Sequence, residues 1–149
     1  MYGIAICGGG GKSWLASKYP KYFIDIDTYV WSDKNKQYHN NILDAVKNND
    51  QDKLSVIYKT ILTQGNNYFK NLKKIVLFHH PVNAQWLDLE LIGSFKPSYD
   101  LFLENINNRS TDLQLISINS WKNLDTAHEY KTHQEFENLM LNLVKTYFH

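Results

Sequence analysis

The chain has 149 residues, of which 43% are hydrophobic and 21% are charged, and its formal net charge at pH 7 is +1. These values are typical of one globular domain with a buried core, and they exclude an intrinsically disordered chain. The small net charge excludes a strong electrostatic attraction to nucleic acid or to an anionic membrane. We therefore expect residues 1–149 to form a single domain.

Cysteine usage and the N-terminal sequence bear on the compartment. Cys7 is the only cysteine, so no internal disulfide can form, which fits a reducing compartment such as the cytoplasm. No charged segment followed by a long apolar run opens the chain, so we predict neither a signal peptide nor a membrane partner. The abundance of Asn, Lys, Ile and Tyr is typical of AT-rich genomes, such as those of phages, viruses or low-GC bacteria.

Apolar patterning predicts strands that alternate with helices along the chain. The predicted strands are 2–6, 22–26, 75–78, 89–92 and 113–118, although a helix fits 89–92 nearly as well. The predicted helices are 12–18, 39–47, 52–72, 83–87, 97–108 and 133–147. This alternation predicts a three-layer α/β fold whose mostly parallel sheet has four to five strands and is covered on both faces.

The most specific pattern is a glycine-rich loop between the first predicted strand and the first predicted helix. Cys7 is followed by Gly8, Gly9, Gly10 and Gly11, and the helix begins with Lys12 and Ser13. Glycines allow a tight turn in which several backbone N–H groups face one anion, and the helix N-terminus adds a partial positive charge. Lys12 could reach the β- and γ-phosphates of a nucleotide, and the Ser13 hydroxyl could ligate Mg²⁺. The loop therefore predicts binding of ATP, or another nucleoside triphosphate, with Mg²⁺.

One position of this loop departs from the usual pattern G-x-x-x-x-G-K-[ST]. Ile6 stands at the first glycine position, and neither Gly3 nor Gly8 has the spacing to replace it. The alternative interpretation is a glycine-rich turn followed by an accidental lysine. Four glycines and Lys-Ser between a strand and a helix favour phosphate binding.

Two carboxylates, Asp25 and Asp27, lie at the end of the second predicted strand. At alternating positions of a strand, both side chains would point to the same side, toward the nucleotide. We expect Asp25 to support Mg²⁺ and contact the acceptor, and Asp27 to orient the acceptor hydroxyl or take its proton. The structural alternative is that Asp25 satisfies backbone groups and Asp27 caps the next helix.

The glycine loop and the D-x-D of Asp25 and Asp27 resemble motifs of the small P-loop kinases. This family includes shikimate and gluconate kinases, adenylate-kinase-like nucleotide kinases and polynucleotide kinases. The resemblance implies a P-loop NTPase fold with a Walker A loop that binds ATP·Mg²⁺. In shikimate-kinase-like members, a matching D-x-D contacts the acceptor and the metal region.

A looser resemblance covers residues 96–109. In the family, this stretch often contains a proline and then a helix that ends in an arginine and covers the phosphates as part of a lid. Arg109 is the only arginine among 16 basic residues, and a guanidinium can hold the transferring phosphoryl group in a bidentate way that lysine cannot. We expect Arg109, Lys12 and Asp27 to be catalytic. The alternative for Arg109 is a solvated cation at a helix end.

Histidines replace the acidic residue that typical P-loop kinases carry after the third strand. His79 and His80 follow the strand 75–78. We expect His79 to contact the acceptor or a phosphate. A packed or solvated histidine is the alternative for each.

Tryptophans provide candidates for binding a base. Asn119 and Trp121 follow the last predicted strand, where the family often holds adenine, and the indole of Trp121 could stack on it. Trp31 follows the D-x-D and could line the acceptor pocket. Core packing is the alternative for both tryptophans.

These observations predict a phosphotransferase that moves the γ-phosphate of ATP to a nucleoside, a nucleotide or a nucleic-acid 5′ end. A single arginine disfavours shikimate, whose carboxylate usually needs arginines. The alternative is a nucleotide-binding or weak NTPase module, without transfer, inside a larger assembly such as a viral one. The irregular glycine loop and the missing acid after the third strand favour that alternative, and the sequence indicates no oligomeric state.

Overall fold

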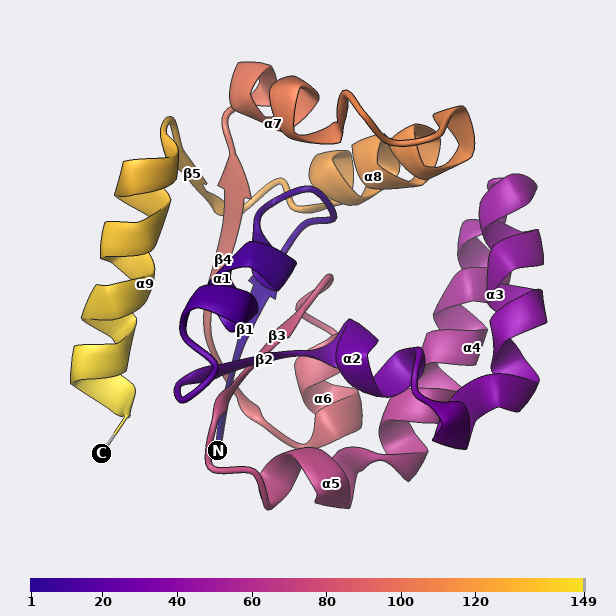
Figure 1. The fold of residues 1–149 in the computed structure, drawn as a ribbon, viewed down its shortest axis with the longest axis horizontal. Coiled ribbons are helices and arrows are strands. Elements are labelled where there is room, and N and C mark those ends of the chain that lie inside the picture. The colour runs from indigo at the N-terminus through magenta and orange to yellow at the C-terminus, as the bar shows by residue number, and fades with distance from the viewer. Residues whose placement is uncertain (149) are drawn as a thin grey trace.

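The computed structural model describes residues 1–148, and five strands in this range form one sheet (Figure 1). The strands are β1 (Tyr2–Ile6), β2 (Phe23–Asp25), β3 (Ile75–Phe78), β4 (Glu90–Pro97) and β5 (His128–Tyr130). Their order is β2-β3-β1-β4-β5, and every neighbouring pair is parallel. The predicted α/β fold with a parallel sheet of four to five strands is therefore confirmed.

Helices cover both faces of the sheet. They are α1 (Lys12–Lys18), α2 (Ile26–Val30), α3 (Lys36–Lys47), α4 (Gln51–Gln64), α5 (Asn66–Lys70), α6 (Asn83–Leu87), α7 (Tyr99–Ile106), α8 (Thr111–Asn123) and α9 (His133–Tyr147), with a 3₁₀ helix, η1, at Asp33–Asn35. Because successive strand residues point to opposite faces, Ala5 and Phe78 pack with α2 to α6, whereas Ile4 and Leu77 pack with α1 and α9. These two cores make the three layers that Figure 1 shows.

The α7–α8 segment lies beyond the carboxyl ends of the strands (Figure 1). A third, smaller apolar cluster joins it to the glycine loop and consists of Cys7, Phe102, Ile106 and Leu124. This cluster holds the segment over the edge of the sheet where β1, β2 and β3 end. The same edge carries the candidate site.

The prediction of a strand at 113–118 is wrong, because these residues belong to α8. Ser110 caps this helix, since its Oγ accepts a hydrogen bond from Leu113 N at 3.4 Å, and Asp112 lies in the first turn. The apolar run is not buried as a strand would be: Leu113 and Leu115 are exposed. The fifth strand is instead the short segment β5, which pairs with β4 and buries Tyr130 completely.

Other boundaries of helices and strands differ from the predicted ones by smaller amounts. The helix predicted for 52–72 is divided at Gly65, which lies against the ring of Tyr29; a Cβ at Gly65 would be 2.7 Å from Tyr29 Cε2. The ambiguous segment 89–92 is part of β4, which continues to Pro97, so α7 begins at Tyr99 with Ser98 as its N-cap.

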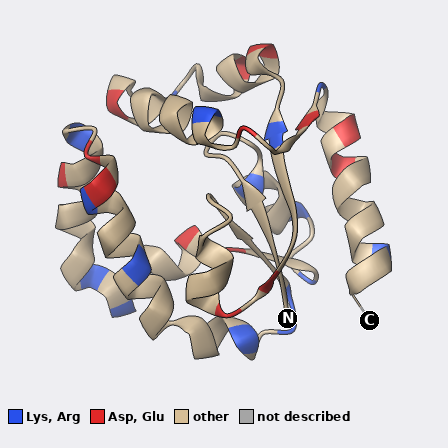
Figure 2. Ribbon diagram, turned by 180° about the vertical axis from the view of Figure 1, so that it is seen from behind, with Lys and Arg blue, Asp and Glu red and all other residues tan. Residues whose placement is uncertain are grey.

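Charged residues of both signs are dispersed along the outer helices (Figure 2). This distribution agrees with the formal net charge of +1 and differs from the one-sided basic face that is typical of nucleic-acid-binding domains. Among residues 1–148, no helix has both the length and the apolar character that crossing a bilayer requires.

The N-terminus of α9 allows a test of how this covering helix is held. Thr132 Oγ1 accepts a hydrogen bond from Glu135 N at 3.1 Å. We predict that Thr132→Ala lowers the free energy of unfolding by about 1 kcal/mol in urea denaturation, because a helix N–H loses its partner. Thr146→Ala is the matched control, since Thr146 Oγ1 only donates to Asn142 O within the same helix. Equal losses in the two variants would contradict the capping role.

Candidate active site

The glycine loop connects β1 to α1 through a tight turn. Gly10 N donates to Cys7 O at 2.9 Å, and the φ angles of Gly9 and Gly11 are 84° and 103°. Residues with a side chain rarely adopt such positive φ angles, which explains the glycines at these two positions. Ile6 does not enter the turn, because it ends β1 and is fully buried in the core next to α1 and α9. The loop therefore forms although the first glycine of the motif is absent.

Lys12 places its ammonium group against this loop. Nζ donates to Ile6 O at 3.1 Å and to Cys7 O at 3.2 Å, and the side chain is buried. Burial lowers the pKa of Lys12, while the carboxylates of Asp25 and Asp27 act in the opposite direction. Both hydrogen bonds go to neutral carbonyl oxygens, so the positive charge of Lys12 is available to an anion in the loop.

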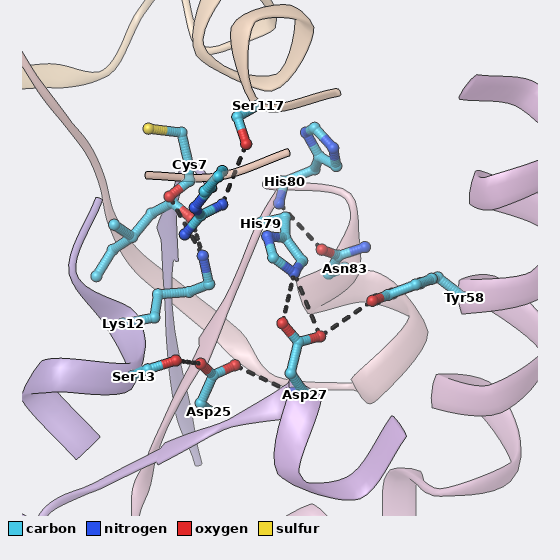
Figure 3. A network of polar contacts seen from close by, with 12 residues as sticks. Cys7, Lys12, Ser13, Asp25, Asp27, Tyr58, His79, His80, Asn83 and Ser117 are labelled. Carbon is cyan, nitrogen blue, oxygen red and sulfur yellow. Dashed lines mark hydrogen bonds and ion pairs between the residues drawn. The ribbon is translucent and has the colours of Figure 1, made fainter. Parts of the chain in front are cut away.

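Ser13 and Asp25 meet at the ends of α1 and β2 (Figure 3). Ser13 Oγ donates to Asp25 Oδ2 at 3.2 Å, and Asp25 Oδ1 accepts from Asp27 N at 3.0 Å. Asp25 is thus the N-cap of α2. The expectation that Asp25 and Asp27 alternate on one strand is wrong, because β2 ends at Asp25 and α2 begins with the next residue.

The Asp27 carboxylate is held by one residue of α4 and one residue of the loop after β3 (Figure 3). Its Oδ1 accepts from Tyr58 OH at 3.0 Å, and His79 Nε2 lies 3.4 Å from both carboxylate oxygens. Burial acts to raise the pKa of Asp27, but His79, Lys12 and the Tyr58 hydroxyl together hold it well below its usual range. Burial and the neighbouring Asp27 raise the pKa of Tyr58, so its hydroxyl stays a donor. Asp27 is therefore ionised at neutral pH.

Tyr58 and Asn105 are site residues that the sequence analysis missed. Tyr58 belongs to an apolar stripe of α4, whose helical spacing indicates packing only. Asn105 lies on α7 and donates from Nδ2 to Gly9 O at 2.9 Å, which ties α7 to the glycine loop. Both contacts join residues far apart in the chain, so no local sequence pattern predicts them.

Arg109 lies just after α7, as the sequence predicts for a lid arginine. Its Nη1 donates to Ser117 Oγ of α8 at 3.1 Å. The same nitrogen would be 3.9 Å from a Cβ built on Gly8, so the guanidinium lies beside the glycine loop. The chain's single arginine thus borders the same loop as Lys12.

Two cavities meet at this edge of the sheet. The loop cavity, of about 610 Å³, is lined by the glycine loop, Lys12, Ser13 and Asp25. The aromatic cavity, of about 400 Å³, is lined by residues of α3, α4 and α8 and includes the side chains of Trp31, Tyr58 and Trp86. The residues that line both cavities are Gly8, Asp27, His79 and Arg109. A group transferred from one cavity to the other would pass these four residues.

The predicted base-binding residues have different positions. Trp31 lines the aromatic cavity. Asn119 and Trp121 lie within α8 rather than in a loop after a strand, which follows from the wrong strand at 113–118. Asn119 Nδ2 donates to Asn49 Oδ1 at 3.2 Å, and Trp121 Nε1 donates to Pro97 O at 2.8 Å. In the described chain, neither residue is part of the lining of the two cavities.

Aromatic residues of α1 and α9 line the loop cavity instead. Trp14 follows Ser13, is exposed, and lies 6.4 Å from Phe136 between ring centroids. His133, the first residue of α9, lines the same cavity. Trp14 directly follows the Lys-Ser pair, and this position is the sequence signal that could have identified Trp14 as a residue of the loop cavity.

The chain has the three-layer α/β fold of P-loop proteins, and the glycine loop, the D-x-D and an arginine lie at one edge of its sheet. Among solved structures, it is similar to shikimate kinase from Acinetobacter baumannii in complex with shikimate, with a TM-score of 0.54 and 16% sequence identity. The match covers 97% of this chain and 92% of that one. No protein-family model and no curated protein matches the chain.

His80 offers a pH-dependent test of the site. Burial, assisted by His79 and Lys12, lowers the pKa of His80 from 6.5 to about 4. Between these two values the unfolded chain binds a proton at this residue and the folded chain does not, so the free energy of unfolding falls as the pH is lowered. We predict that His80→Gln reduces this fall in urea denaturation from pH 6.5 to 4. The exposed His128→Gln should leave it unchanged; an unaltered slope in His80→Gln would refute the assignment.

Proposed function

We propose that the chain is a kinase that transfers the γ-phosphate of ATP to a nucleoside, a nucleotide or a nucleic-acid 5′ end bound in the aromatic cavity. The observation that carries this proposal is the junction of the two cavities, where Asp27 and Arg109 face both. The likeness in fold to shikimate kinase supports a phosphoryl-transfer enzyme in general. Arg109 is the one Lys or Arg among the described residues that line the aromatic cavity, which is why we do not propose shikimate, a carboxylate, as the acceptor.

In this proposal the triphosphate occupies the loop cavity. The backbone N–H groups of the loop and the start of α1 bind the phosphate oxygens, and the ammonium of Lys12 neutralises the β- and γ-phosphates. The exposed indole of Trp14 provides a flat face for the base, the role that the sequence analysis gave to Trp121.

Ser13 and Asp25 fit a magnesium ion that accompanies the nucleotide. Their adjacent hydroxyl and carboxylate oxygens, 3.2 Å apart, are the hard ligands that Mg²⁺ prefers. No group of three or more His, Cys, Asp or Glu among residues 1–148 could hold a metal by itself. Phosphate oxygens would therefore complete the ligand set, and the bound ion would neutralise charge on the β- and γ-phosphates.

Asp27 and Arg109 act on the reacting groups. The acceptor hydroxyl donates to the ionised Asp27 carboxylate, whose orientation Tyr58 and His79 fix. Because the transition state of phosphoryl transfer is loose, orientation contributes more than early proton removal, which suits a carboxylate of low pKa. The guanidinium of Arg109 stabilises the equatorial oxygens of the transferring group.

A second candidate function is a nucleotide-binding or weak NTPase module without transfer. The contacts of Tyr58 and His79 with Asp27 favour this second function. A carboxylate that already accepts two hydrogen bonds has less capacity to accept one from an acceptor hydroxyl. Incubation with labelled ATP and nucleosides, nucleotides and 5′-hydroxyl oligonucleotides separates the two. A phosphorylated acceptor supports the kinase, whereas phosphate release alone supports the NTPase.

The loop assignment predicts a loss of ATP affinity when Lys12 is neutralised. Lys12→Met retains the buried aliphatic stem but removes the charge, and we expect ATP·Mg²⁺ to bind about 100-fold more weakly in titration calorimetry. The exposed Lys145→Met, on α9, is the control and should bind ATP as the parent chain does. Unchanged affinity in a folded Lys12→Met, verified by its thermal unfolding, would refute phosphate binding by the loop.

The role of Asp27 predicts a separation of binding from transfer. Asp27→Asn keeps the shape of the side chain but removes its charge, so ATP affinity should be largely retained while transfer falls by a factor on the order of 10²–10⁴. Transfer of labelled phosphate to the mixed acceptors is the measurement, and the exposed Asp33→Asn is the control. Normal turnover in Asp27→Asn would remove this residue from the mechanism.

A further inference from the structure

The charge of the aromatic cavity disfavours an anionic acceptor. Arg109 is the one Lys or Arg that lines it among the described residues, and this guanidinium is shared with the loop cavity. The carboxylates of Asp27 and Asp52 line the same cavity. His80 is neutral near pH 7 because its pKa is about 4, and His79 faces Asp27. No cation therefore remains for a phosphate or carboxylate on the acceptor.

The wall of this cavity is apolar and partly uncovered. Trp31, Val82 and Leu113 line it and are 42%, 41% and 42% exposed. Tyr58 and Trp86 line it as well. Large apolar side chains that stay exposed around a hollow mark a site for an apolar or aromatic ligand. Three aromatic side chains in one cavity favour a flat ring over an aliphatic body.

Two nearly buried polar side chains add hydrogen-bonding groups to this wall. Asn83 is 2% exposed, and its carboxamide is fixed because Oδ1 accepts from His80 N at 3.0 Å. Ser120 is 5% exposed and lines the cavity, and its Oγ has no hydrogen-bond partner among residues 1–148. A buried polar group without a partner is costly, so a polar atom of a ligand that reached Ser120 Oγ would relieve this cost. Ring nitrogens and carbonyl oxygens of a nucleobase are such atoms.

We propose that the acceptor is an uncharged nucleoside, and not a nucleotide, a nucleic-acid 5′ end or a carboxylate such as shikimate. This inference rests on the proposed kinase function. The base lies among the aromatic side chains with its edge toward Asn83 and Ser120, and a sugar hydroxyl faces Asp27. The γ-phosphorus bonds to the hydroxyl oxygen, its bond to ADP breaks, and the hydroxyl proton leaves through Asp27 to solvent. The product gains negative charge beside Asp27 and Asp52, which favours its release.

Matched pairs of ligands test the proposal. The full chain is titrated calorimetrically with adenosine, guanosine, cytidine, uridine and thymidine, each against its 5′-monophosphate, and with shikimate. A non-hydrolysable ATP analogue with Mg²⁺ is present, so that phosphates cannot enter the loop cavity. We expect at least one nucleoside to bind about tenfold or more tightly than its 5′-monophosphate, the effect of like charges without a counter-cation.

Three variants connect the preference for a nucleoside over its monophosphate to the aromatic cavity. Trp31→Ala should weaken nucleoside binding by about tenfold, as expected for loss of a stacking partner, whereas Trp14→Ala should weaken only the ATP analogue. Asp52→Lys should narrow the difference between a nucleoside and its monophosphate. The proposal is overturned if no nucleoside binds, if a monophosphate or shikimate binds as tightly, or if Trp31→Ala binds normally.

Transfer from ATP is scored separately, so that the two proposals can fail independently. Nucleoside binding without a phosphorylated product would overturn the kinase function and leave the nucleoside specificity of the aromatic cavity intact. Phosphorylation of a monophosphate or a 5′-hydroxyl oligonucleotide in preference to the nucleosides would overturn the acceptor class and leave the kinase function intact. The binding measurement and the transfer measurement use the same protein preparation.

Discussion

The site depends on the parallel pairing of β1, β2 and β3. Because these strands point in one direction, the residues that follow them arrive at the same edge of the sheet: the glycine loop, the D-x-D and His79. The contacts of Ser13 with Asp25 and of His79 with Asp27 join segments that are otherwise distant in the chain. An antiparallel β3 would carry His79 to the opposite edge and leave Asp27 without this neighbour.

At this edge of the sheet, neutral hydrogen-bonding groups position the charged side chains as much as other charged groups do. Carbonyl oxygens of Ile6 and Cys7 hold the Lys12 ammonium, and the Tyr58 hydroxyl donates to the Asp27 carboxylate. The cation and the carboxylate therefore stay close without neutralising each other in a direct ion pair. In the proposed function, this separation leaves Lys12 free to bind phosphate while Asp27 contacts the acceptor hydroxyl.

Much of the architecture, and the grouping of the glycine loop and the D-x-D at one edge of the sheet, could be predicted from the sequence, because local patterns specify them. The glycine loop, the alternation of strands and helices, and the position of Arg109 after a helix all depend on neighbouring residues. For the segment 113–118, local patterning gave the wrong prediction. Its apolar alternation fits a strand, whereas the cap at Ser110 starts a helix. Contacts that Tyr58 and Asn105 make depend on how distant helices pack, which no short pattern encodes.

The burial of the single cysteine has a practical consequence. Cys7 is fully buried within the glycine loop, and burial raises the pKa of its thiol to about 11. The nucleophilic thiolate is therefore scarce at neutral pH, and the sulfur is shielded from reagents. A cysteine introduced at an exposed position would react selectively with a maleimide label. The chain thus accepts a fluorophore pair or spin labels at cysteines introduced on α3 and α8, which line the aromatic cavity, without prior removal of its own cysteine, so that the distance between these two helices can be followed directly.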